Sequence, residues 1–267
     1  MPITESMDGT KIGYAETGSG PLGVVFVHGW SCSGGTWAPV LSHLSNTGRR
    51  FVQVDLRGHG NSAADGLEHS VQRYAEDIVA AADAAGLDRF VTVGHSMGGK
   101  YAQYVRAIAA NRLIGQIAVC PTPSTSVEHE ADDQMIATMS ANSGDIEGFI
   151  GVLAYLTKTP LPDDIVRPLA QEAAQLSREV LAESMRAFAT ADVTDDIVGA
   201  GTPPPTFVIG GMDDPLYSPE LLRARIAIEN PKASLAVLPS GHDPLHETPR
   251  ELSLLIEGFL AAAAFLT

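Results

Sequence analysis

Six short apolar runs, separated for the most part by helix-like segments, constrain the fold of this chain more than any other feature. They cover Val24–Val27, Phe51–Val54, Phe90–Val93, Ile117–Cys120, Thr206–Ile209 and Leu235–Leu238. Because the runs are almost continuously apolar, they are typical of strands that are buried on both faces. Strands that alternate with helices indicate right-handed crossovers. The sequence therefore predicts an α/β fold with a mostly parallel central sheet flanked by helices.

Two helices and a further strand are expected between and before these runs. The segment from Ser70 to Gly86 has an apolar stripe at helical spacing and ends at a glycine, and a second helix is expected over Lys100–Ala110. The alternating stretch Lys11–Glu16 is followed by glycines and a proline. It predicts an antiparallel edge strand that leads into the sheet.

The alternation stops between about Pro123 and Pro205, where no strand-like run occurs. Helical spacing over Ile146–Leu156 and Leu169–Ala189 indicates an insertion of several helices, punctuated by prolines that include Pro168. The expected organisation is a core formed by residues 1–124 and 202–267, with a helical cap formed by residues 125–201.

The amino-acid composition argues against several classes of function. The 267-residue chain has 17 Lys and Arg against 32 Asp and Glu, so its net charge of −15 opposes binding to nucleic acid or anionic lipid. The N-terminus lacks the pattern of a secretory signal, and no apolar stretch is long enough for a membrane span. Two cysteines are too few for a disulfide framework. We therefore expect a cytoplasmic location and a small-molecule partner, while the oligomeric state stays open.

The third run leads into the segment Gly94-His95-Ser96-Met97-Gly98, which core packing does not explain. A serine between two glycines, placed after a strand and before a helix, is typical of a tight turn that exposes a nucleophilic hydroxyl. The start of the following helix directs free backbone N–H groups toward the space above the serine. Ser96 is therefore the candidate nucleophile.

A serine hydroxyl needs a base within hydrogen-bond reach, and that base needs a carboxylate to orient it. His242 follows the last run, and the acidic pair Asp213-Asp214 follows the fifth. In an open α/β sheet, ligands bind outside the carboxyl ends of the strands, so these groups are expected near Ser96. The residues themselves do not decide between Asp213 and Asp214.

These features together resemble the α/β-hydrolase fold superfamily. The resemblance rests on the turn around Ser96, the "HGW" segment at residues 28–30, the "DLRGHGNS" segment at residues 55–62 and the order Ser, Asp, His, and it covers nearly the whole chain. It implies that Ser96 is the nucleophile, His242 the base and Asp214 the acid. It also implies an oxyanion hole made by the backbone N–H groups of Trp30 and Met97.

A substrate pocket beneath the cap is expected to be lined largely by apolar side chains. The candidates are Cys32, Cys120, Phe149, Tyr155, Met185, Phe188 and Leu216. His59 and His95 are interpreted as structural hydrogen-bonding residues, and His246 as either a pocket or a surface residue. Trp37 is assigned to helix packing, and the acidic pairs of the middle segment to helix starts or solvent. No metal site and no cofactor are predicted.

The predicted function is a cofactor-free serine hydrolase that cleaves a small to medium, largely apolar ester or lactone through an acyl-enzyme. The alternative from another class is a ligand sensor of the same fold with slow turnover. Within the superfamily, a carbon–carbon hydrolase, a perhydrolase and a cofactor-free dioxygenase also stay open, since one fold hosts many functions. The physiological substrate does not follow from the sequence.

Overall fold

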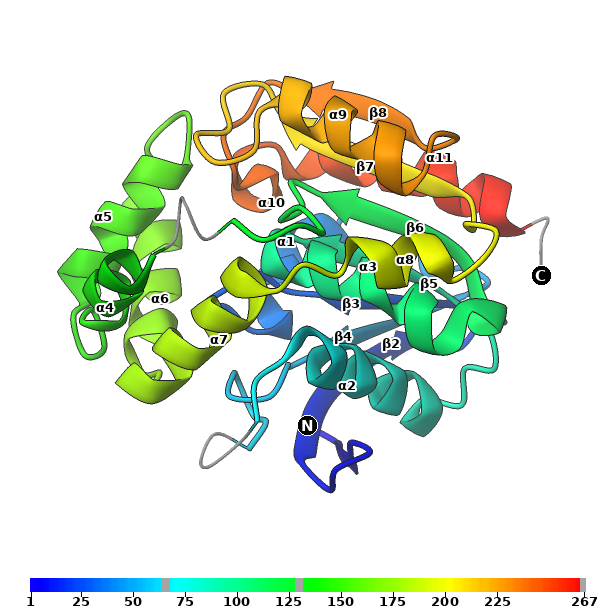
Figure 1. Cartoon of the computed structure of the whole chain (residues 1–267), viewed down its shortest axis with the longest axis horizontal. Coiled ribbons are helices and arrows are strands. Elements are labelled where there is room, and N and C mark those ends of the chain that lie inside the picture. The colour runs from blue at the N-terminus through cyan, green and yellow to red at the C-terminus, as the bar shows by residue number, and fades with distance from the viewer. Residues whose placement is uncertain (64–67, 128–131, 265–267) are drawn as a thin grey trace.

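The computed structural model, which describes residues 1–63, 68–127 and 132–264, has one eight-stranded sheet at its centre (Figure 1). The strands lie in the order β1-β2-β4-β3-β5-β6-β7-β8, and the pairs from β4 to β8 are parallel. Their bounds are β1 Ile3–Glu5, β2 Lys11–Gly18, β3 Leu22–Val27, β4 Arg49–Val54, β5 Phe90–His95, β6 Leu113–Val119, β7 Thr206–Gly211 and β8 Ser234–Leu238. Each predicted run overlaps one of β3 to β8, so the predicted α/β fold is confirmed.

The predicted antiparallel strand exists as β2, but its place at the edge of the sheet is wrong. β2 pairs with β4 on one side and with the short strand β1 on the other, so β1 forms the edge. β1 is only three residues long and is largely exposed. A segment that short has no measurable alternation, which is why the sequence pattern does not reveal it.

Helices cover both faces of the sheet and enclose two apolar layers (Figure 1). Their bounds are α1 Ala38–Leu41, α2 Val71–Ala84, α3 Met97–Ala109, α9 Pro219–Glu229, α10 Pro244–Glu247 and α11 Pro249–Ala263. Along β3, Val25 and Val27 pack with α2 and α3, whereas Val24 and Phe26 pack with α1 and α11. Both sets are buried because successive side chains of a strand point to opposite faces. The helices predicted at Ser70 and Lys100 correspond to α2 and α3.

The middle segment forms the helices α4 Asp133–Ser140, α5 Ile146–Leu156, α6 Asp163–Ala174, α7 Arg178–Thr190 and α8 Thr194–Gly199, and we call the first four, α4 to α7, the helical insertion. The predicted helix over Leu169–Ala189 is in fact parts of α6 and α7, since the chain breaks near Ser177, whose hydroxyl caps α7. Pro168 lies inside α6 rather than at a boundary. Figure 1 shows α4 to α7 gathered beyond one end of the sheet. Among the described helices, none is long and apolar enough to cross a bilayer.

Lys100 joins α3 to both ends of the helical insertion. Its side chain is fully buried, and Nζ donates to the carbonyl oxygens of Thr125 at 3.1 Å, Phe188 at 2.7 Å and Ala191 at 2.6 Å. An ammonium group has three donors, so all of them are used. Burial lowers the pKa of Lys100 to about 8, which leaves the group charged at neutral pH. The helix that begins at Ser96 is therefore tied to both connections of the insertion.

Replacement of Lys100 by methionine should destabilise the protein by about 2 kcal/mol, because three buried carbonyl groups lose their donor while the buried charge is relieved. Urea unfolding measures this change in the free energy of unfolding. Lys232→Met, at an exposed lysine, is the matched control and should leave the midpoint unchanged. Equal midpoints for the two variants would contradict the role assigned to Lys100.

Candidate active site

The turn between β5 and α3 places Ser96 in a backbone conformation that few side chains adopt. Its φ is 52° and its ψ is −122°, and the chain tolerates this turn only because its neighbours are small. A Cβ on Gly98 would lie 2.2 Å from the carbonyl oxygen of His28, and one on Gly94 would lie 2.3 Å from that of Gly98. Both distances are shorter than any real contact, so glycine is required at both positions. The turn therefore lifts the Ser96 hydroxyl above the sheet, as the sequence pattern predicts.

Three side chains from the carboxyl ends of β5, β7 and β8 form one hydrogen-bonded chain. The Ser96 hydroxyl donates to His242 Nε2 at 2.8 Å, and His242 Nδ1 donates to Asp214 Oδ2 at 2.9 Å. Asp214 Oδ1 accepts from the backbone N–H groups of Leu216 at 2.8 Å and Tyr217 at 3.0 Å. The structure thus brings together the three residues selected from the sequence.

The structure also separates the two adjacent aspartates. Asp214 is buried beside His242, whereas Asp213 forms an ion pair with Lys158 at 2.7 Å and its side chain is 46% exposed. Burial opposes ionisation of Asp214, but the hydrogen bonds from His242 and from two backbone amides outweigh it and lower its pKa below the ordinary value. The ionised carboxylate keeps the proton of His242 on Nδ1, which leaves Nε2 free to accept from Ser96.

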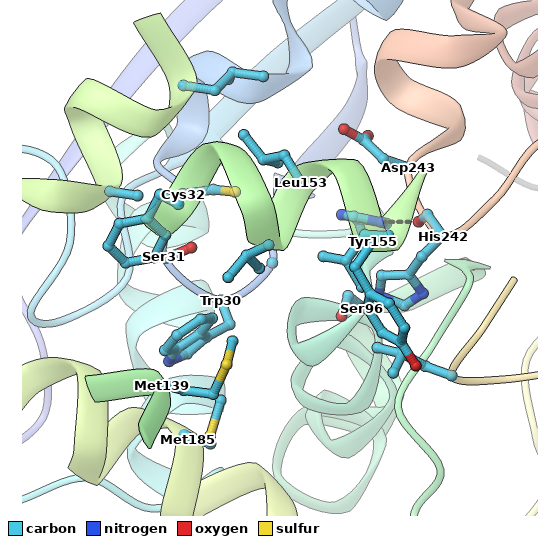
Figure 2. A pocket seen from close by; sticks show the side chains of 18 of the residues that line it. Trp30, Ser31, Cys32, Ser96, Met139, Leu153, Tyr155, Met185, His242 and Asp243 are labelled. Carbon is cyan, nitrogen blue, oxygen red and sulfur yellow. Dashed lines mark hydrogen bonds between the residues drawn. The ribbon is translucent and has the colours of Figure 1, made fainter. Parts of the chain in front are cut away.

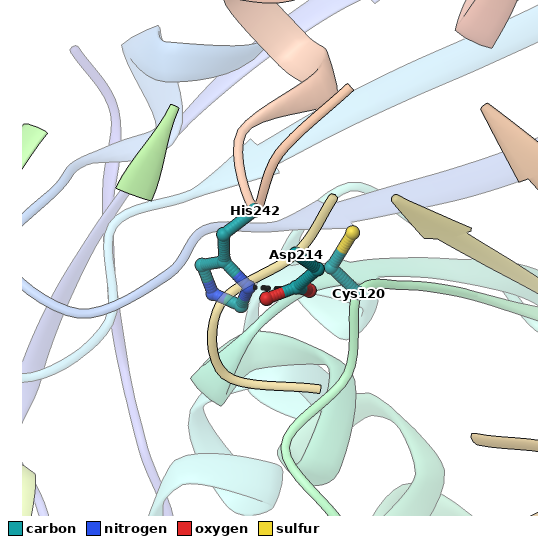
Figure 3. A group of neighbouring side chains, drawn as sticks. All are labelled: Cys120, Asp214 and His242. Atoms are coloured by element: carbon teal, nitrogen blue, oxygen red, sulfur yellow. Dashed lines mark hydrogen bonds and ion pairs between the residues drawn. The ribbon is translucent and has the colours of Figure 1, made fainter. Parts of the chain in front are cut away.

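Cys120 does not line the pocket, so its prediction as a pocket residue is wrong. The chain turns at Cys120 with a φ of 42°, and the thiol is fully buried beside Asp214 (Figure 3). The ligand atoms of Cys120, Asp214 and His242 lie within 4.8 Å of one another, the one such group among the residues that the structure describes. Both nitrogens of His242 already take part in the hydrogen bonds with Ser96 and Asp214.

The backbone amides of Trp30 and Met97 lie on the loops that follow β3 and β5. Within the described ranges, no hydrogen bond is formed by either N–H, so both are free to bind an oxygen above Ser96. The Trp30 indole donates from Nε1 to the carbonyl oxygen of Leu181 at 3.1 Å and packs on Phe149, with 6.1 Å between ring centroids. Trp30 therefore connects the loop after β3 to α7 and α5.

Ser96 and His242 open into a cavity of about 780 Å³ between the sheet and the helical insertion (Figure 2). The predicted residues that line it are Trp30, Cys32, Phe149, Tyr155, Met185, Phe188 and Leu216. The sequence left His246 open, and it too lines the cavity. Pocket residues that the sequence analysis missed include Thr36, Val127, Met135, Met139, Leu153, Tyr217 and Asp243. Most of the wall is apolar, and no lysine or arginine belongs to its described part.

Three buried histidines, His28, His59 and His95, surround the turn and form hydrogen bonds, as predicted for His59 and His95. His95 Nε2 donates to the carbonyl oxygen of His242 at 2.8 Å, and His28 Nε2 accepts from the Leu56 amide at 3.0 Å. His59 Nδ1 lies 3.0 Å from the carbonyl oxygen of Arg57. Burial lowers the pKa of His28 and His95 to about 4 and that of His59 to about 3.

Comparison with known proteins identifies the family of this chain. The chain matches the alpha/beta hydrolase family over residues 24–253 and therefore belongs to that family. The non-heme haloperoxidase of Rhodococcus erythropolis is 29% identical over 233 residues, which cover 80% of this chain and 82% of that protein. These similarities support a hydrolase.

Two solved structures share the fold. An esterase from Exiguobacterium antarcticum superposes with a TM-score of 0.85 at 19% identity, covering 97% of this chain and 98% of that one. The enol-lactonase of Burkholderia xenovorans gives a TM-score of 0.85 at 20% identity, covering 97% of this chain and 100% of the enzyme.

The buried histidines make stability depend on pH. Their ordinary pKa is 6.5, and in the folded chain His28 and His95 bind protons only near pH 4, so the unfolded state binds more protons between these values. The free energy of unfolding should therefore fall with decreasing pH in this window, by up to about 1.4 kcal/mol per pH unit for each histidine. Thermal unfolding between pH 7.5, about one unit above the window, and pH 4.5, inside it, measures the slope.

The variant His59→Gln removes one of these groups and should make the slope shallower, whereas His43→Gln, at an exposed histidine, should not. A melting temperature that stays constant across the window in the unmodified protein would contradict the explanation.

Proposed function

We propose that the protein is a serine hydrolase that cleaves uncharged, largely apolar carboxylic esters or lactones through an acyl-enzyme. The observation that carries the proposal is the hydrogen-bonded chain from Ser96 through His242 to Asp214, which opens into a cavity with a mostly apolar wall. An apolar wall without described lysine or arginine favours a substrate that carries no charge. The enol-lactonase and esterase of the same fold are compatible with this class.

In the first half of the reaction, the Ser96 oxygen attacks the carbonyl carbon while His242 Nε2 takes the hydroxyl proton. Asp214 stabilises the imidazolium that forms. The negative charge on the carbonyl oxygen is stabilised by the N–H groups of Trp30 and Met97, and such donors are worth roughly 3 to 4 kcal/mol each. The tetrahedral intermediate expels the alcohol, which receives its proton from His242, and the acyl group stays on Ser96.

In the second half, water attacks the acyl carbon and His242 again accepts the proton. The second tetrahedral intermediate releases the carboxylic acid, and the proton returns to the Ser96 oxygen. Every step uses side chains and amides of this chain together with water. The hydrogen bond to Asp214 keeps a proton on His242 Nδ1 in both the neutral ring and the imidazolium, so only Nε2 gains and loses a proton.

Replacement of Ser96 by alanine should lower kcat/KM for p-nitrophenyl butyrate by about 10⁴-fold or more, because the nucleophile is lost. The circular dichroism spectrum should stay unchanged. A fluorophosphonate probe should label the unmodified protein at Ser96 and should not label the variant. Undiminished turnover in the variant would contradict the proposal, and a single acylation without further turnover in the unmodified protein would favour the ligand sensor.

The two aspartates offer a matched pair of substitutions. Asp214→Asn should lower kcat about 10³ to 10⁴-fold, because an amide neither holds the required tautomer of His242 nor stabilises its cation. Asp213→Asn changes an exposed ion pair and should keep kcat within about threefold. Steady-state kinetics on the same ester measure both variants. A larger loss in Asp213→Asn would reverse the assignment of the acid.

A further inference from the structure

A second histidine and carboxylate pair lies in the loop after β8, next to the residues that act on the ester. His246 Nδ1 and Asp243 Oδ2 are 2.8 Å apart, and their side chains are 5% and 10% exposed. Asp243 precedes α10 and His246 lies within it, three residues later. Both side chains line the cavity that contains Ser96 and His242. The mechanism above uses neither of them.

Each side chain of this pair has one polar atom without a hydrogen-bond partner in the described part of the chain. Among the residues that the structure describes, none forms a hydrogen bond with Asp243 Oδ1 or with His246 Nε2. Asp243 Oδ1 and His246 Nε2 are not among the side-chain atoms that the protein encloses completely without a hydrogen-bond partner. A polar group in an apolar wall is unfavourable unless it is hydrogen-bonded, so each atom needs a partner from water or from a molecule bound in the cavity.

The pair marks one end of the cavity, which we call the polar end and define by Cys32, Thr36, Asp243 and His246. Burial raises the pKa of the Cys32 thiol, and Asp243 is close enough to raise it further. Figure 2 shows Asp243 at the opposite end of the view from Met139 and Met185. Asp243 therefore lies away from the two methionines of the apolar wall (Figure 2).

The charges at the polar end favour an uncharged group. Burial opposes both charges, but the 2.8 Å contact between the side chains lowers the pKa of Asp243 and raises the pKa of His246, so the contact favours the ion pair. Because the charge of His246 is already balanced by Asp243, and the described cavity wall has no lysine or arginine, a carboxylate ligand would add an unpaired negative charge beside Asp243. A ketone can accept from His246 Nε2, and a hydroxyl can in addition donate to Asp243 Oδ1.

We propose that His246 and Asp243 form a specificity subsite that binds an uncharged oxygen group of the substrate, a ketone or a hydroxyl, remote from the scissile ester bond. The subsite rests on the proposed function, since it selects among substrates of the Ser96 reaction. The subsite favours substrates that carry such an oxygen group over substrates with a purely apolar chain. The residues act by binding and take no part in proton transfer to the ester.

The test compares kcat/KM for p-nitrophenyl oxoalkanoates with kcat/KM for the unsubstituted esters of the same chain length. A second series carries the ketone on the alcohol side, so that both halves of the substrate are sampled. The unmodified protein should prefer the oxo ester by about tenfold in at least one series, the effect of one hydrogen bond. His246→Leu should reduce that ratio to about one, and His246→Gln should restore part of it, because an amide N–H still donates.

His43→Leu makes the same substitution at an exposed site and should keep the ratio of the unmodified protein. A ratio that is equal in the unmodified protein and in His246→Leu, for every ester tested, would overturn the subsite. A His246-dependent preference for carboxylate-terminated esters would overturn the choice of an uncharged group. If no ester shows turnover that depends on Ser96, the proposed function itself fails, which is distinguishable from failure of the subsite alone.

Discussion

The close approach of two backbone segments at the turn around Ser96 is the constraint on which the site depends. Gly98 packs directly on the carbonyl oxygen of His28, so the loop after β3 and the start of α3 are held at a distance that no side chain would permit. Ser96 itself adopts a positive φ, a conformation that is unfavourable by about 1 to 2 kcal/mol for a residue with a Cβ. Backbone hydrogen bonds maintain this conformation: the Ser96 N–H donates to the carbonyl oxygen of Val119 at 2.9 Å, and the Ser96 carbonyl oxygen accepts from the Thr122 N–H at 3.0 Å. The same approach brings the Trp30 and Met97 loops to one point.

The two histidine and aspartate pairs, His242 with Asp214 and His246 with Asp243, differ in what completes them. Asp214 has His242 on one oxygen and two backbone amides on the other, so the chain itself satisfies the whole carboxylate. Asp243 has only His246, and the cavity must supply the remaining partner. A pair completed by the protein suits a fixed role in proton transfer. A pair completed by the ligand suits recognition.

Local signals in the sequence account for most of the fold and for the selection of Ser96 and His242. Strand periodicity and helix caps depend on neighbours in sequence, so the runs that became β3 to β8 could be identified directly. Asp213 and Asp214 could not be separated, because identical neighbours differ only in which side chain the folded turn directs inward. Cys120 was misplaced for a similar reason, since the positive φ at the end of β6 is a property of the folded chain. Whether Asp243 faces a cavity depends on packing from distant segments, which no local pattern reports.

Trp30 links chemistry and substrate binding within one residue. Its backbone N–H is directed to the developing oxyanion in the proposed mechanism, while its indole bonds to Leu181 and packs on Phe149 of the helical insertion. Lys100 makes a second connection, from the helix that begins after Ser96 to both ends of the same insertion. A displacement of the insertion by a bound substrate would therefore act on the oxyanion donor and on the nucleophile turn together. Substrate fit at the cavity wall and the alignment of the reacting groups are, for this physical reason, not independent.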